Sequence, residues 1–134
     1  ARRIRIVGRP LAPGALADAR TLTLAPRSSY DLRLVASRTL YDAGVAVSRS
    51  PSLSGLPPGG RLHVHPLDLD RLGATTGTSL KVSTAAASLV LEVEADPGVA
   101  RGTAWLPFNQ PSSTAGALFD SSAPVIDLRL ENLA

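Results

Sequence analysis

The chain contains no cysteine among its 134 residues. This excludes disulfides, thiolate zinc sites, cysteine-held iron–sulfur clusters and cysteine nucleophiles within it. It also contains no methionine and begins with alanine, so we expect a fragment or a processed chain. No apolar run approaches the roughly 18 residues that a membrane-spanning helix needs, which predicts no direct membrane span.

Aromatic residues make up only 4% of the chain, and lysine supplies one of its 14 basic residues. Because nucleic-acid-binding surfaces combine basic residues with stacking aromatics, this scarcity argues against a nucleic-acid partner. The net charge of +3 is unevenly distributed, since residues 1–50 carry nine Arg and three Asp, whereas residues 51–134 carry five basic and eight acidic residues. Positive charge is therefore concentrated toward the N-terminus.

Apolar residues make up 44% of the chain, which at this length predicts one ordinary domain. Residues 1–28 are predicted to form a lead-in or linker, in which Ile4 and Ile6 alternate with arginines and short strands are compatible with the pattern. Residues 29–134 are predicted to form the folded domain.

Short segments with alternating apolar and polar residues dominate the rest of the chain. They predict strands at residues 29–38, 61–65, 79–83, 88–94, 102–108 and 125–131. Short helices are predicted at residues 66–73 and 113–119, and a long connection at residues 39–58. Because no long helix separates the strands, the pattern predicts an all-β fold with one or two short helices, an antiparallel or mixed β-barrel.

The most regular alternation lies in residues 88–94, where Leu89, Leu91 and Val93 are predicted to face the interior. A charge buried there would have no partner. Leu91→Asp is therefore expected to destabilise the domain severely.

Four segments follow one another in a distinctive order. They are residues 65–73 (HPLDLDRLG), 76–78 (TGT), 96–99 (DPGV) and 101–109 (RGTAWLPFN). In this order, residues 29–131 resemble the C-terminal molybdopterin-dinucleotide-binding domain of the molybdenum oxidoreductase superfamily. The resemblance implies a double-psi β-barrel.

The finer spelling of residues 37–42 (SRTLYD), 50–53 (SPSL) and 105–111 (WLPFNQP) is similar to the large G subunit of bacterial NADH-quinone oxidoreductase, respiratory complex I. This resemblance implies a C-terminal structural domain that supports NADH-to-quinone electron transfer without carrying a redox centre or cofactor. Iron–sulfur clusters are then expected in the parent chain. The implied partners are the preceding domains of that subunit and other subunits of the peripheral arm, on the cytoplasmic side at the inner face of the plasma membrane.

Two alternatives remain open at this point. In the first, the chain is the cofactor-binding domain of an active molybdenum enzyme and holds molybdopterin guanine dinucleotide. In the second, it is a double-psi barrel of another kind, used for substrate recognition in an ATPase or in a self-processing decarboxylase. No residues are predicted to be catalytic in the domain itself, and whether the chain belongs to an enzyme is left open.

Five polar residues are candidates for contacts with such a cofactor, or for vestiges of them. They are Ser37, Arg38, Tyr41, Asn109 and Gln110. A guanidinium such as that of Arg38 suits a phosphate, and side-chain amides suit a pterin edge. The alternative is a salt bridge from Arg38 to Asp42 and a turn at Asn109.

The helix predicted to start at Pro66 carries Asp68 in its first turn, which complements the helix dipole and repels phosphate. This segment therefore indicates fold more than ligand. His63 and His65 share one strand face, but no third histidine exists to complete a metal site. They are predicted to face solvent, and no metal site is predicted.

Overall fold

The computed structural model describes residues 32–111, 115–120 and 122–133. In chain order the elements are β1 (Leu32–Arg38), α1 (Val45–Ser48), β2 (Leu62–Val64), α2 (Pro66–Asp70), β3 (Ser79–Ser83), β4 (Ser88–Ala95), β5 (Thr103–Phe108), the 3-10 helix η2 (Ala115–Leu118) and β6 (Ile126–Asn132). The strand and helix predictions are confirmed where these residues cover them. The predicted lead-in, residues 1–28, lies outside the described residues.

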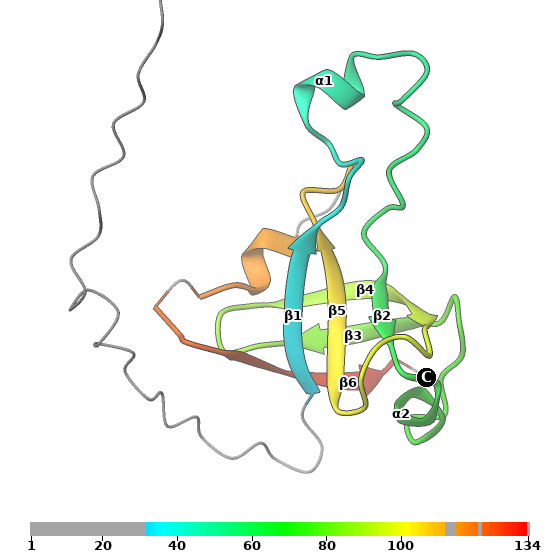
Figure 1. Ribbon diagram of the computed structural model, residues 1–134. Helices are drawn as coiled ribbons and strands as arrows, with labels where there is room; N and C mark the ends of the chain where they lie inside the picture. The colour runs from blue at the N-terminus through cyan, green and yellow to red at the C-terminus, as the bar shows by residue number, and fades with distance from the viewer. Residues whose placement is uncertain (1–31, 112–114, 121, 134) are drawn as a thin grey trace, which may run out of the picture.

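The six strands form a closed barrel in the order β1-β5-β2-β4-β3-β6. β1 pairs with β5, and β2 with β4, in parallel, whereas the other four pairings are antiparallel. Figure 1 shows β1, β5 and β2 crossing in front of β3, β4 and β6. Closure gives every described strand two neighbouring strands along at least part of its length.

The barrel consists of two halves with the same connectivity. Exchanging β1, β2 and β3 with β4, β5 and β6 leaves both the strand order and the pairing directions unchanged. An Asp-x-Gly turn follows the first strand of each half, and in each turn the glycine N–H donates to the aspartate Oδ1 over 2.8 Å, Gly44 to Asp42 and Gly98 to Asp96. The fold is thus all-β, a double-psi β-barrel, as predicted.

Alternate residues of the strands point inward and fill the barrel. The largest fully buried side chains are Leu62, Leu69, Leu80, Leu106, Leu118, Leu128, Val64, Val82, Val93 and Pro107. Leu69 comes from α2 and Leu118 from η2, so these two helices contribute to the same apolar cluster. Burial of this apolar surface is the main stabilising contribution, at about 25 cal/mol per Å².

The inward face predicted for β4 is confirmed, but its depth differs along the strand. Val93 is fully buried, whereas Leu89 and Leu91 are only partly buried. The first part of β4 pairs with β3 alone, because the three-residue β2 reaches only residues 93–95. Leu91 therefore lies where β4 has only one neighbouring strand. The loss of stability in Leu91→Asp is expected to be smaller than that of a substitution at a fully buried position.

The connection between β1 and β2 projects from the barrel as an arm, residues 39–60, with α1 near its tip (Figure 1). A backbone hydrogen bond of 2.7 Å from Ala43 N to Asn109 O fixes its base. Leu40 and Val45 are exposed on it. None of the helices in the described part of the chain is long and apolar enough to cross a bilayer.

Candidate functional site

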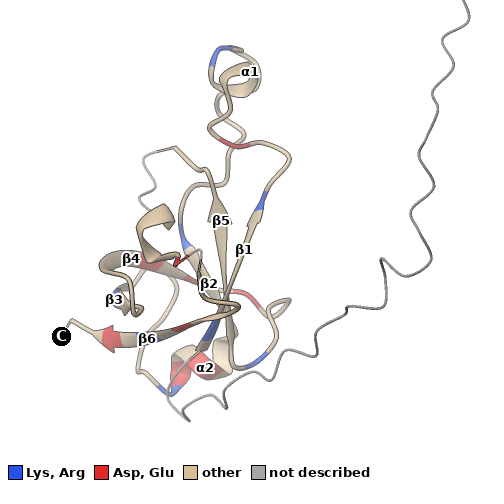
Figure 2. Ribbon diagram, turned by 90° about the vertical axis from the view of Figure 1, so that its left-hand side faces the viewer, with Lys and Arg blue, Asp and Glu red and all other residues tan. Residues whose placement is uncertain are grey.

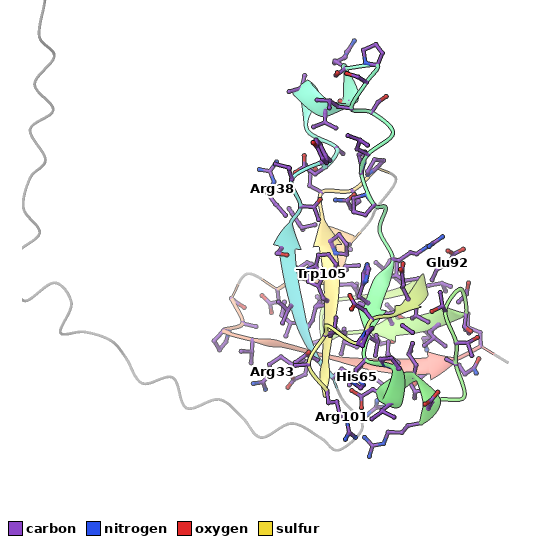
Figure 3. All side chains as sticks on the ribbon, turned by 45° about the vertical axis from the view of Figure 1, so that its right-hand side comes forward. Arg33, Arg38, His65, Glu92, Arg101 and Trp105 are labelled. Atoms are coloured by element: carbon purple, nitrogen blue, oxygen red, sulfur yellow. The ribbon has the colours of Figure 1, made fainter. Side chains whose placement is uncertain are left out.

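The five candidate residues gather at one end of the barrel. β1 and β5 run in parallel with Arg38 opposite Phe108, so the segments that leave both strands start side by side. Ser37 and Arg38 end β1, Tyr41 lies at the base of the arm, and Asn109 and Gln110 follow β5. Figure 3 shows Arg38 at this end, away from His65 and Arg101 near α2.

Arg38 forms an ion pair with Asp42. Its Nε and Nη2 lie 2.8 and 2.6 Å from the Asp42 Oδ2, which confirms the alternative interpretation of this arginine. The Asp42 side chain is 6% exposed and that of Arg38 is 67% exposed. Because a guanidinium has more N–H donors than these contacts use, Arg38 keeps donors directed toward solvent.

Three groups interact with the carboxylate of Asp42. The hydrogen bond from Arg38 is the largest cause that lowers the pKa of Asp42, followed by the Gly44 N–H and the side chain of Asn109. A Cβ at Gly44 would lie 2.8 Å from the Asp42 Oδ1, so a larger residue at this position would displace the carboxylate. Asp42 therefore carries its charge at neutral pH and fixes the Arg38 guanidinium in place.

This lowered pKa predicts a pH-dependent contribution to stability. A carboxyl group whose pKa is lower in the folded chain stabilises the fold fully above its unfolded value, and the contribution disappears as pH falls through the folded value. The difference in the free energy of unfolding between wild type and Asp42→Asn is expected to be largest at neutral pH and to shrink below the usual pKa of 3.8. Urea unfolding of both proteins over the acidic range measures it, and a difference independent of pH would contradict it.

Gln110 is a buried amide that joins three segments. Its Nε2 donates to Thr39 Oγ1 over 2.9 Å and to Phe108 O over 3.4 Å, while its Oε1 accepts from Gly59 N over 3.2 Å. The side chain is thereby committed to both ends of the arm and to the end of β5. Gln110 therefore holds the arm and the end of β5 in place beside the other candidate residues.

The other three candidates have more accessible groups. Ser37 accepts a 2.8 Å hydrogen bond from Trp105 Nε1, which leaves its own hydroxyl hydrogen to donate. Asn109 is exposed and has a φ of 56°, which confirms its predicted turn role. Tyr41 is half-buried, and its carbonyl accepts from Thr39 Oγ1 over 2.6 Å. Together with Arg38, the Ser37 hydroxyl and the Asn109 amide can bind an anionic ligand that carries further hydrogen-bond acceptors.

The two histidines have structural positions that the alternation did not predict. The prediction that His63 faces solvent is wrong, because Trp105 on the neighbouring strand covers its ring at a centroid distance of 4.6 Å. His65 forms the N-cap of α2, with its Nδ1 accepting from Leu67 N over 3.2 Å. Within the described residues, no three His, Asp or Glu side chains gather as a metal site requires.

Asp68 does more than complement the dipole of α2. It is 5% exposed, and its Oδ2 accepts from Gly102 N over 2.7 Å. Arg71 and Arg101 lie 3.7 and 4.0 Å from its Oδ1. Acidic residues of α2 therefore lie beside basic residues (Figure 2), and Asp68 attaches the helix to the start of β5.

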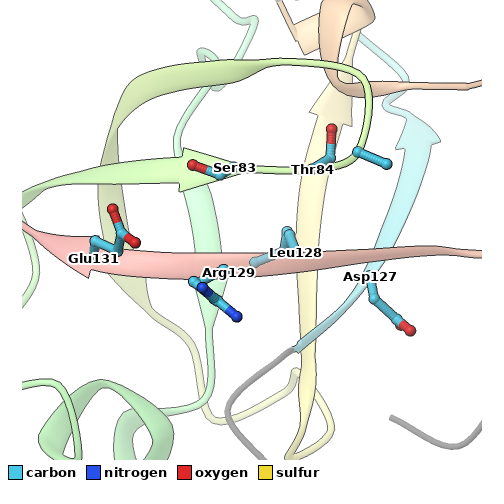
Figure 4. A pocket seen from close by; sticks show the side chains of 7 residues that line it. Ser83, Thr84, Asp127, Leu128, Arg129 and Glu131 are labelled. Carbon is cyan, nitrogen blue, oxygen red and sulfur yellow. The ribbon is translucent and has the colours of Figure 1, made fainter. Parts of the chain in front are cut away.

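A hollow of about 300 Å³ lies over β3 and β6 (Figure 4). Two of its charged groups already have partners, since Asp127 pairs with Arg33 at 3.0 Å and Glu131 with Lys81 at 2.9 Å. Thr84 Oγ1 donates to Leu118 O over 3.1 Å. These groups serve the barrel wall, and the Arg38 end is the better candidate for binding.

Comparison with known proteins identifies relatives of this chain. The family described as "Molydopterin dinucleotide binding domain" matches residues 32–126. The F420-dependent formate dehydrogenase 1 subunit alpha of Methanococcus maripaludis is 26% identical over 93 residues, which cover 68% of this chain and 14% of that protein. The chain thus spans far less than two thirds of this curated relative.

Two solved structures are also similar. Acetylene hydratase from Pelobacter acetylenicus has a TM-score of 0.49 and 24% identity, covering 60% of this chain and 11% of that one. A rationally designed protein has a TM-score of 0.45 and 20% identity, covering 74% of this chain and 93% of that one.

Proposed function

The chain belongs to the molybdopterin dinucleotide-binding domain family, and from this premise we propose that it holds one end of a molybdopterin dinucleotide in a larger oxidoreductase. The observation that carries this proposal is the exposed guanidinium of Arg38, held in place by the buried carboxylate of Asp42. A guanidinium that is already oriented loses less freedom when it binds a phosphate, so more of the contact contributes to affinity.

The residues at this end fit such a group. Arg38 faces the phosphates, and the Ser37 hydroxyl and the Asn109 amide supply hydrogen bonds beside it. Asp42 and Gln110 act through these residues, because their own polar groups are used within the barrel and the arm. The dinucleotide supplies the redox chemistry when bound, while the chain binds and orients it.

Arg38→Gln in the full-length protein is expected to weaken the affinity for the pterin by about 10- to 100-fold, so that less pterin stays bound. This corresponds to the loss of one charged hydrogen-bonding contact. The measurement is pterin fluorescence after oxidative extraction, together with molybdenum and tungsten content. Arg49→Gln is the matched control, since Arg49 is an exposed arginine on the same arm. Equal pterin loss in both variants would contradict a specific role for Arg38.

A second candidate function is a structural domain of the kind found in the G subunit of NADH-quinone oxidoreductase. The observation that favours it is the internal pairing of the candidate residues, because Arg38 already has Asp42 and Gln110 already has three partners. Its partners would then be the preceding domains and the other subunits of the peripheral arm, on the cytoplasmic side of the membrane. Wild-type protein with neither pterin nor metal would support this candidate and reject the first.

A further inference from the structure

A hollow of about 390 Å³ lies on the outer wall of the barrel, and none of the five candidate residues lines it. Val35 and Trp105, which are register partners on β1 and β5, form part of its lining together with Val99 and Asp96. Val35 is 48% exposed although it is a valine in the middle of a strand. The hollow therefore combines apolar walls, one aromatic ring and one carboxylate.

The aromatic ring is fixed on two sides. Trp105 donates from Nε1 to Ser37 Oγ over 2.8 Å, and its ring contacts that of His63 at a centroid distance of 4.6 Å. Trp105 lies on β5 (Figure 3) between the buried Ala104 and Leu106, so the alternation of the strand directs it outward. A cation that enters the hollow therefore meets an immobile indole, which favours a cation–π contact.

The carboxylate of Asp96 differs from its counterpart in the other half of the barrel. Asp42 and Asp96 occupy equivalent Asp-x-Gly turns, and each uses Oδ1 to accept the glycine N–H. The Oδ2 of Asp42 pairs with Arg38, whereas the Oδ2 of Asp96 faces only His63 Nδ1, at 3.3 Å. Within the described residues, no Arg or Lys forms an ion pair with Asp96. The position that Arg38 fills in one half thus lacks a guanidinium in the other.

We propose that this outer hollow binds a guanidinium, and that residues 2–7 of the same chain supply it. This segment reads RRIRIV, so Arg3 and Arg5 alternate with Ile4 and Ile6, and Arg2 adds a third guanidinium. The alternation suits a site that pairs one carboxylate with apolar walls, since the arginine stem packs on valine while its head reaches Asp96 and Trp105.

Charge and length support this occupant. Residues 1–31 carry six Arg and two Asp, a net +4, whereas residues 32–134 carry eight basic and nine acidic residues, a net −1. The segment joins the barrel at Leu32, three residues before Val35, and the 24 residues from 8 to 31 are long enough to return to the hollow. Attachment to the same chain raises the local concentration of these arginines. The inference does not depend on cofactor binding.

Trp105 is the only tryptophan, so its fluorescence and its single indole N–H resonance report on this hollow directly. In the full chain, replacing Arg2, Arg3 and Arg5 together with Gln is expected to shift the indole resonance and to increase quenching by acrylamide. The matched control replaces Arg20 and Arg27 with Gln and is expected to leave both signals unchanged.

A peptide with the sequence of residues 1–8 tests whether these residues act by binding in the hollow, and not by an effect of the three substitutions elsewhere in the chain. Added to the triple variant, it is expected to restore the wild-type signals, and it is expected to fail once Asp96→Asn is also present. An Asn at this position can still accept the Gly98 N–H, so the turn is retained. Asp120→Asn, in another exposed turn, is the control that leaves restoration intact.

Three results would overturn the proposal. The first is a triple variant whose indole signals equal those of wild type, and the second is a shift of these signals in the Arg20 and Arg27 variant instead. The third is a wild-type signal that depends on protein concentration. The last result would assign the arginine to a second copy of the chain.

Discussion

Val93→Asp is expected to unfold the barrel. Val93 is fully buried, opposite Leu62 of β2, and its backbone N–H and C=O bond to Thr78 and Gly77 at 3.0 and 2.8 Å. An aspartate there would lie among apolar side chains and force either an unpaired charge or a buried neutral carboxyl group. The expected cost exceeds about 4 kcal/mol, a large part of the about 5–15 kcal/mol that stabilises an ordinary domain.

Thermal unfolding followed by circular dichroism measures this effect. Val90→Asp is the matched control, because Val90 lies on the same strand with its side chain 58% exposed, and its effect is expected within about 0.5 kcal/mol. Leu91→Asp, at a partly buried position, is expected to fall between the two. A Val93→Asp protein that melts like wild type would show that the interior of the barrel has been placed on the wrong face of β4.

Asp68→Ala is expected to lower the free energy of unfolding by about 1.5–3 kcal/mol, the usual range for a hydrogen bond to a charged group. The substitution removes the 2.7 Å contact with Gly102 N, which attaches α2 to β5. Arg71 and Arg101 contribute less, because both side chains are largely exposed and such pairs are screened by water.

Urea unfolding of Asp68→Ala and of Asp70→Ala measures this difference. Asp70 belongs to the same helix and is exposed, so its replacement is expected to change stability little. Equal losses in the two variants would mean that the interaction of the negative charges with the helix dipole, and not the bond to Gly102, accounts for the effect.

The strands could be predicted from the sequence because each alternates with a period of two residues. β3 matches the predicted residues 79–83 without any shift. The order of the strands around the barrel could not be read from this periodicity, since the pairing of β1 with β5 joins residues about 70 positions apart. The family resemblance supplied the double-psi topology instead.

The candidate residues were chosen from the sequence, but only some of their contacts could be predicted from it. The Arg38 to Asp42 pair follows from local spacing and was foreseen as an alternative. The three bonds of Gln110 depend on where the arm returns to the barrel, which no local pattern encodes. The cover over His63 likewise depends on the strand that lies beside it. The resemblance to the G subunit of complex I is finer than the family match, and pterin analysis decides between the two candidate functions.

The pairing of strands from one half with strands from the other has a consequence for synthesis on the ribosome. β1 emerges first, yet both of its partners, β5 and β6, are among the last three strands of the chain. The N-terminal half therefore cannot complete its hydrogen bonding until β5 and β6 have left the exit tunnel. Such nonlocal pairing slows folding. During that interval β1 lacks both of its native partners.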